Sequence, residues 1–190
     1  MFPQFEGKGA NIHAAMFYTK DASADNSLLT DSLFHSEMPM PATAQKHTFH
    51  SILSDSLEEE CSYDVVSEVR GKICNIIAEN KEIKDDDDHI AVSKNIVKNV
   101  LRDCGVSEEK VESFGAKFDE EFGVGKDIHP ENIVNVNQFA VKTPDVQIRV
   151  NPERGDLVDV RVIDGVKYVL VRAEDGVEVN GVFINISDKQ

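Results

Sequence analysis

The sequence predicts an α+β fold, with an acidic, mostly helical region over residues 1–137 and a small antiparallel β-meander over residues 138–190, packed together as one unit. Two observations lead to this prediction. In the first two-thirds of the chain, apolar residues recur in several segments at the spacing of an amphipathic helix. In the last quarter the apolar residues alternate with polar ones, and Asp-Gly or Asn-Gly dipeptides interrupt the alternation.

The first 41 residues carry weaker signals than the rest. Alternation over residues 12–19 favours a strand over a helical turn, and we expect such a strand to join the C-terminal sheet or to cover one of its faces. Residues 25–37 have the apolar spacing of a short helix, and Pro39 and Pro41 would end it.

Two longer helices are predicted over residues 43–59 and 63–80, with Thr43 and Ser62 as their candidate N-caps. Each has an apolar stripe that would face the core. The stripes are Phe49, Ile52, Leu53 and Leu57 in the first helix, and Val65, Val66, Val69, Ile73, Ile76 and Ile77 in the second.

A second helical pair follows the charged segment at 81–89, which we interpret as an exposed loop. Ser93 would cap the first helix of the pair, Gly105 would end it, and Ser107 would open the second, which ends at Gly123. Because the connection is about three residues, the two helices should pack antiparallel. Their predicted buried residues are Ile96, Val97, Val100, Leu101, Val111, Phe114, Phe118 and Phe122.

The C-terminal run predicts four or five short antiparallel strands. The hairpin signals are Asp164-Gly165, Asp175-Gly176 and Asn180-Gly181, and a further turn is expected at residues 151–155. Around the first signal, Ile163 would face Val166 and Val160 would face Val169. This register gathers five valines on one face, which is the better core candidate. These residues are Val158, Val160, Val162, Val169 and Val171.

Composition excludes several classes of protein. The 190 residues are 41% hydrophobic and 29% charged, as in globular domains, and no apolar run is long enough for a membrane span. The first residues lack the pattern of a signal peptide. Three cysteines without a Cys-x-x-Cys pair indicate reduced thiols, and therefore a cytoplasmic protein.

The formal net charge is −15, and it is unevenly distributed. Residues 138–190 have 9 acidic and 7 basic side chains, net −2, whereas residues 1–137 have 26 acidic and 13 basic side chains, net −13. Such a field repels phosphates and anionic lipids, so we expect neither direct nucleic-acid binding nor membrane binding. Solubility is the simplest explanation of the charge, and a surface that mimics nucleic acid is the alternative.

His47 and His50 are the metal-ligand candidates that the pattern suggests, because residues three apart on one helix can share a zinc ion. A third ligand would have to come from His35, Glu58 or Cys61. Surface histidines explain the pair more simply. No cofactor and no catalytic residue is predicted, since no nucleophile and base occur in a recognisable pattern.

Three functional hypotheses follow. The first is a non-catalytic binding or regulatory module that acts through protein contacts. The second is an acidic inhibitor that mimics nucleic acid and occupies a basic groove on a nucleic-acid-binding protein, such as a CRISPR-type nuclease. Its candidate partner-binding carboxylates are Asp85, Asp86, Asp87, Asp88, Glu108, Glu109 and Glu112. The third is a metal-dependent enzyme that uses His47 and His50.

Several short sequence segments together resemble a family of bacterial proteins known only as a domain of unknown function. They are residues 1–5, 17–19, 39–42 and 45–49, and in the C-terminal run residues 143–146, 150–154, 161–165 and 177–181. The family's members are longer, and this chain is similar to their C-terminal part. The resemblance implies a bacterial cytosolic protein, and it assigns no activity and no site residues.

Overall fold

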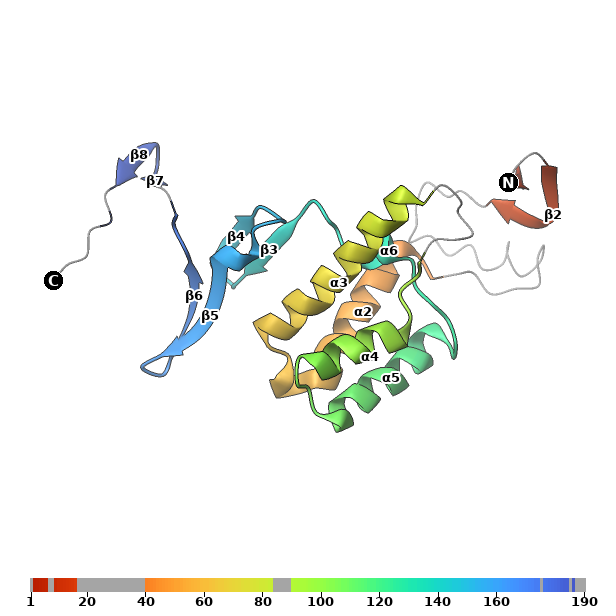
Figure 1. The fold of residues 1–190 in the computed structure, drawn as a ribbon, viewed down its shortest axis with the longest axis horizontal. Helices are drawn as coiled ribbons and strands as arrows, with labels where there is room; N and C mark the ends of the chain where they lie inside the picture. The colour runs from red at the N-terminus through yellow and green to blue at the C-terminus, as the bar shows by residue number, and fades with distance from the viewer. Residues whose placement is uncertain are drawn as a thin grey trace. The chain divides into compact units, whose positions relative to one another are not determined.

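The computed structural model describes residues 2–6, 9–16, 40–83, 90–174, 176–184 and 186. The chain divides into two compact units, residues 1–41 and residues 42–190. The helices gather in the N-terminal part of the second unit, and short hairpins follow them towards the C-terminus (Figure 1). This order confirms the predicted α+β fold.

The first unit contains an antiparallel hairpin of β1 (Phe2–Glu6) and β2 (Gly9–Met16). The predicted strand is therefore confirmed over residues 12–16. Among the described strands β2 pairs with β1, its neighbour in the chain. Adjacent strands form a hairpin at a much lower cost in chain entropy than strands from opposite ends of a chain. Residues 17–19 and the predicted helix at 25–37 lie outside the described residues.

The second unit begins with a group of helices. They are α2 (Ala42–Leu57), α3 (Tyr63–Glu82), α4 (Lys94–Asp103), α5 (Glu108–Phe122) and the short α6 (Pro130–Ile133), with a 3₁₀ turn, η1 (Glu58–Glu60), between α2 and α3. The Oγ atoms of Ser62 and Ser93 accept the N–H groups of Val65 and Ile96, so both predicted N-caps are confirmed. The cap predicted at Thr43 is wrong, because α2 already includes this residue.

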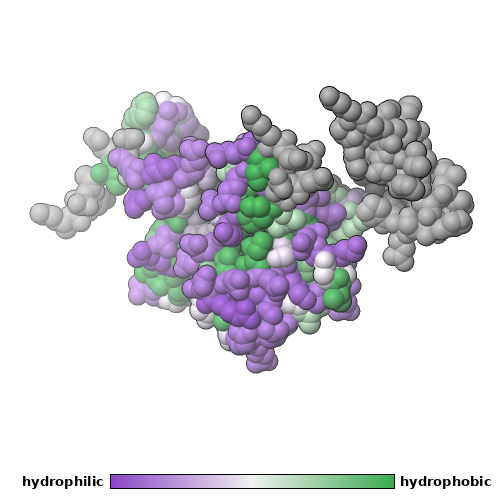
Figure 2. Space-filling view, turned by 45° about the vertical axis from the view of Figure 1, so that its right-hand side comes forward, coloured by the Kyte–Doolittle hydropathy of each residue, from purple (hydrophilic) through white to green (hydrophobic). Residues whose placement is uncertain are grey.

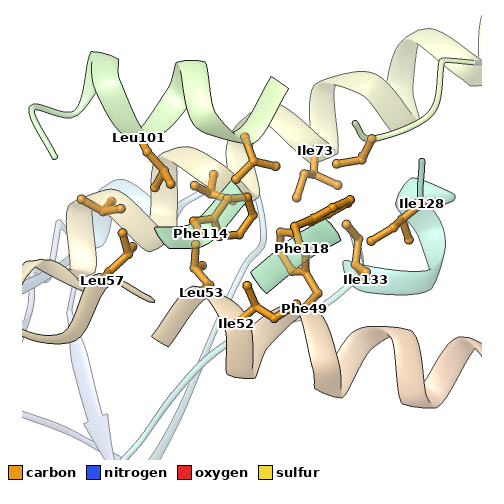
Figure 3. Packing of buried hydrophobic residues seen from close by; sticks show 14 of the residues in the cluster. Phe49, Ile52, Leu53, Leu57, Ile73, Leu101, Phe114, Phe118, Ile128 and Ile133 are labelled. Atoms are coloured by element: carbon orange, nitrogen blue, oxygen red, sulfur yellow. The ribbon is translucent and has the colours of Figure 1, made fainter. Parts of the chain in front are cut away.

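Three phenylalanines occupy the centre of the helical core (Figure 3). The ring of Phe114 lies edge-on to Phe49 with 6.2 Å between centroids, and Phe118 lies 5.9 Å from Phe114. All three are at most 2% exposed. Because the burial of one large apolar side chain stabilises a fold by about 1.5–3 kcal/mol, this group is a principal tie between α2 and α5.

Ion pairs along α4 and α5 show that the two helices run antiparallel, as predicted. Lys94 at the start of α4 pairs with Asp119 near the end of α5. One turn further along α4, Lys98 Nζ lies 2.7 Å from Glu112 Oε1. At the other end of the pair, Arg102 Nη2 lies 2.6 Å from Glu108 Oε1. The partner number falls as the α4 number rises, which is the signature of antiparallel packing.

A side-chain clamp holds the chain where it enters α4. The amide of Asn80 donates to the Ile90 carbonyl at 2.9 Å and accepts the Ile90 N–H at 2.7 Å. Asn80 is only 8% exposed, and these two bonds satisfy both polar atoms of its amide. A backbone bridge between Val92 and Ile128 follows directly. Asp85 to Asp88 lie outside the described residues.

Six strands form three consecutive antiparallel hairpins in the described residues from 139 to 184. They are β3 (Phe139–Lys142) with β4 (Gln147–Val150), β5 (Val158–Ile163) with β6 (Val166–Val171), and β7 (Val177–Val179) with β8 (Val182–Ile184). The single meander expected from the sequence is therefore divided into separate pairs. The predicted register is confirmed, since Ile163 faces Val166 and Val160 faces Val169.

The valine face of the β5–β6 hairpin, predicted to be core, is largely exposed. Val158 is 4% exposed, but Val160 and Val162 are 44% and 66% exposed. The main core cluster of the second unit consists of helical and connecting residues between 49 and 133, and none of the described hairpin residues belongs to it. Alternation identifies which side chains share a face, but it does not show whether another element covers that face.

Candidate functional site

An apolar groove lies where α2, α3 and β3 meet, and it has a volume of about 460 Å³. We call it the α2–α3–β3 groove. Its lining residues are Lys46, Phe49, His50 and Leu53 of α2; Val66, Val69, Arg70 and Ile73 of α3; Ile133, Val134, Asn135 and Gln138 around and after α6; and Phe139, Ala140 and Lys142 of β3. Pockets of this size, mostly apolar with a few polar groups, are the usual form of binding sites.

Val66 identifies the open side of the groove. It belongs to the α3 stripe that the sequence assigns to the core, yet it is 42% exposed, whereas Val65 and Val69 are nearly buried. Its predicted burial is therefore wrong. Val66 lies at the border of the apolar stripe, so its side chain points to the edge of the helix–helix contact and not to its centre. At this edge lies the groove.

Aromatic and polar contacts from α3 hold β3 at the groove. The guanidinium carbon of Arg70 lies 5.1 Å from the centroid of the Phe139 ring, and Arg70 Nη2 donates to the Gln138 carbonyl at 3.4 Å. The Tyr63 ring packs against Phe139 with 6.3 Å between centroids, and its hydroxyl donates to the Gly155 carbonyl at 3.1 Å. A cation over an aromatic face contributes about 0.5–1 kcal/mol when exposed.

The polar groups of the groove are basic or neutral. Lys46, His50, Arg70 and Lys142 line it, and no carboxylate does so within the described part of the chain. Desolvation lowers the pKa of His50 below its usual value of 6.5, and the charge of Lys46 lowers it further, while a hydrogen bond to the Ile133 backbone opposes both. The groove therefore presents cationic groups around an apolar floor, which suits an apolar ligand that carries negative charge.

The two metal candidates of the sequence line different hollows. His50 lines the α2–α3–β3 groove, and His47 lines a polar hollow of about 390 Å³ with Asp55, Glu120 and Glu121. Over the residues that the structure describes, no three His, Cys, Asp or Glu side chains are placed to hold a metal ion together. His35, one of the suggested third ligands, is not among them.

Two of the three predicted partner-binding acids on α5, Glu108 and Glu112, already have partners in this chain. Arg102 binds Glu108 through two nitrogens, and this hydrogen bonding lowers the pKa of Glu108 to about 2. Glu112 pairs with Lys98, and Glu109 is exposed. The side of the molecule in Figure 2 is mostly hydrophilic, with a narrow band of hydrophobic residues. On α5, at least, cations of the same chain offset part of the negative charge.

Sequence reasoning did not find the α2–α3–β3 groove, because its residues come from segments that are far apart in the chain. The patterns assign Phe49 and Val69 correctly to the core. They contain no signal that Phe139 packs against Arg70, since a contact of this kind depends on how the elements pack. The chain has a net charge of −15, and only the structure shows that basic side chains gather at one of its grooves.

The described helices include none that is both long enough and apolar enough to cross a membrane. No curated protein and no solved structure shows significant similarity to the chain. A family model does match, and its description is "Domain of unknown function (DUF4317)". Because the match extends over residues 1–182, nearly the whole chain, the protein belongs to this family.

Proposed function

We propose that this chain is a non-catalytic, protein-binding module of the bacterial cytoplasm, and that the α2–α3–β3 groove takes an apolar, acidic segment of a partner protein. The observation that carries the proposal is the apolar groove with basic side chains at its border, in a chain of net charge −15. Three cysteines without a Cys-x-x-Cys pair support a reducing compartment.

The chemistry of the groove favours an extended or helical peptide with alternating apolar and acidic side chains. Val66 and Phe139 offer apolar contact, and burial of such area is the main favourable term in association. Lys46 and Lys142 would meet carboxylates of the partner, which adds specificity and a faster encounter. A basic segment would be repelled.

Display selection tests this proposal directly. Peptides of random sequence are selected on the immobilised full chain, and we expect enrichment of sequences that combine large apolar residues with Asp or Glu. The Val66→Asp variant should no longer bind these peptides, because it places a negatively charged carboxylate in the apolar groove. Val124→Asp is the matched control, since Val124 is 81% exposed in the turn after α5 and does not line the groove.

A second pair of variants isolates the charge. Lys142→Glu should weaken binding of the selected peptides, and Lys126→Glu, with the same change in net charge at an exposed position outside the groove, should not. Enrichment of basic peptides, or equal binding by the Val66→Asp and Val124→Asp variants, would contradict the proposal.

Nucleic-acid mimicry is the weaker proposal. Asp85 to Asp88 are not among the described residues, and Glu108 and Glu112 are engaged with Arg102 and Lys98. A mimic needs carboxylates that are free to meet a basic partner. The metal-dependent enzyme has no supporting observation of its own, since His47 and His50 line separate hollows.

A further inference from the structure

The β5–β6 hairpin leaves one edge of β5 open. Asp164 and Gly165 have φ of 51° and 79°, the conformation of a tight two-residue turn, which makes Ile163 and Val166 a hydrogen-bonded pair. Such pairs alternate along an antiparallel ladder. A bond of 2.7 Å from Arg172 N–H to the Leu157 carbonyl confirms the alternation at the far end. The backbone groups of Val158, Val160 and Val162 therefore point away from β6.

This outer edge has no partner within the described chain, because β5 pairs with no strand other than β6. The Val158 N–H bonds to the Gly155 carbonyl and so marks one end of the open edge. The N–H groups of Val160 and Val162 and the carbonyls of all three valines remain available. An exposed strand edge of this kind is a template for pairing with another strand.

We propose that the open edge of β5 pairs antiparallel with β5 of a second copy of this chain, centred on Val160. In this register Val160 faces Val160 of the second copy, and Val158 faces Val162. The two Val160 residues exchange N–H and carbonyl bonds, and each Val162 N–H donates to a Val158 carbonyl, so four backbone hydrogen bonds follow from the two-fold symmetry.

The charges on β5 select this register. Residues 158–162 read Val-Asp-Val-Arg-Val, so antiparallel pairing about Val160 sets Asp159 against Arg161 twice. A shift of two residues would instead set Arg161 against Arg161, or Asp159 against Asp159. Opposite charges directly across a ladder are favourable and like charges are unfavourable. Asp159 and Arg161 already share one face, where Arg161 Nε lies 2.5 Å from Asp159 Oδ2.

The pairing also gives the exposed valines a larger apolar face. Val160 and Val162 are 44% and 66% exposed in the single hairpin. A two-stranded hairpin is only marginally stable in water, whereas a sheet of four strands with one apolar face is more stable. The proposal does not involve the α2–α3–β3 groove and is independent of the proposed function.

The test is sedimentation equilibrium of the full chain and its charge variants. The wild type should dimerise with concentration. Asp159→Arg or Arg161→Asp alone places like charges opposite each other, and either should raise the dissociation constant about tenfold. The double variant Asp159→Arg/Arg161→Asp should restore dimers, and an equimolar mixture of the two single variants should associate more tightly than either alone. Glu178→Arg, on β7, changes the net charge by the same amount as Asp159→Arg and should leave the dimer unaffected.

A backbone variant tests the edge itself. Val160→Pro removes an outward N–H without removing a bond to β6, so it should abolish dimers while far-UV circular dichroism of the helices stays unchanged. A wild type that stays monomeric at all concentrations overturns the proposal. This holds even if a strand of another protein binds the edge. Single variants that dimerise like the wild type, or a mixture without gain, overturn it as well.

Discussion

Ser62 and Thr43 are both predicted from the sequence to be helix N-caps, but in the structure only Ser62 is one. Ser62 Oγ accepts the Val65 N–H at 3.3 Å, whereas Thr43 lies within the first turn of α2. We expect Ser62→Ala to lower the free energy of unfolding by about 1 kcal/mol, the usual value of an N-cap. Thr43→Ala should leave it unchanged or raise it slightly, because alanine has the higher helix propensity. Urea unfolding followed by circular dichroism measures both, and equal losses would contradict the assignment.

His50 should make stability depend on pH. Its pKa is lower in the folded chain than its usual value of 6.5, chiefly through desolvation, so the unfolded chain binds the proton more readily. The contribution of His50 to stability is therefore fully present above pH 6.5 and is lost as the pH drops below it towards the folded pKa. His50→Gln should flatten this slope. Midpoints of urea unfolding across this range test the expectation, and an unchanged slope would contradict it.

At the scale of elements, the clamp between Asn80 and Ile90 connects α3 to the approach of α4. Asn80→Ala removes both hydrogen bonds and leaves a partly buried backbone pair unsatisfied. We expect a loss of about 1–3 kcal/mol in the free energy of unfolding. Asn75→Ala is the matched control, because Asn75 is an exposed residue of the same helix. Faster hydrogen exchange at the Ile90 amide in the Asn80 variant alone would report the same loss locally.

The elements also show where pattern reasoning succeeds and where it ends. The helices, the caps at Ser62 and Ser93, and the register at Ile163 depend on neighbours in the chain, and the sequence predicts each of them. The exposure of Val66 and Val162 depends on which element packs against them. Periodicity carries no information about this, so both were assigned to the core.

At the scale of the whole molecule, stability is concentrated in the helical part. The buried core cluster runs from Phe49 to Ile133, so a fragment of residues 42–137 contains all of it. We expect this fragment to unfold cooperatively, with a midpoint close to that of the full chain. A fragment of residues 138–190 should lack a cooperative transition, because isolated two-stranded hairpins are marginal in water. Calorimetry of the two fragments decides, and a non-cooperative helical fragment would contradict the placement of the core.

The charge asymmetry at this scale was predictable from composition, but its meaning was not. The acidic residues Glu108 and Glu112 bind cations of α4, while Lys46 and Lys142 stay at the α2–α3–β3 groove. Net charge describes the far field of a protein, and recognition depends on the local arrangement of charges. We therefore expect recognition to depend on the few basic groups at the groove more than on the excess of carboxylates.

The Asn80–Ile90 clamp also joins two positions that lie ten residues apart in the chain, and so closes a loop in the topological sense. When two positions of a chain are held together, added length between them enters the free energy through the logarithm of the number of residues, at about 0.6 kcal/mol for each doubling. A peptide epitope or a small reporter sequence inserted between the two clamp residues should therefore cost little stability. An insertion there would provide a handle on the protein that leaves the α2–α3–β3 groove and the β5 edge unaltered.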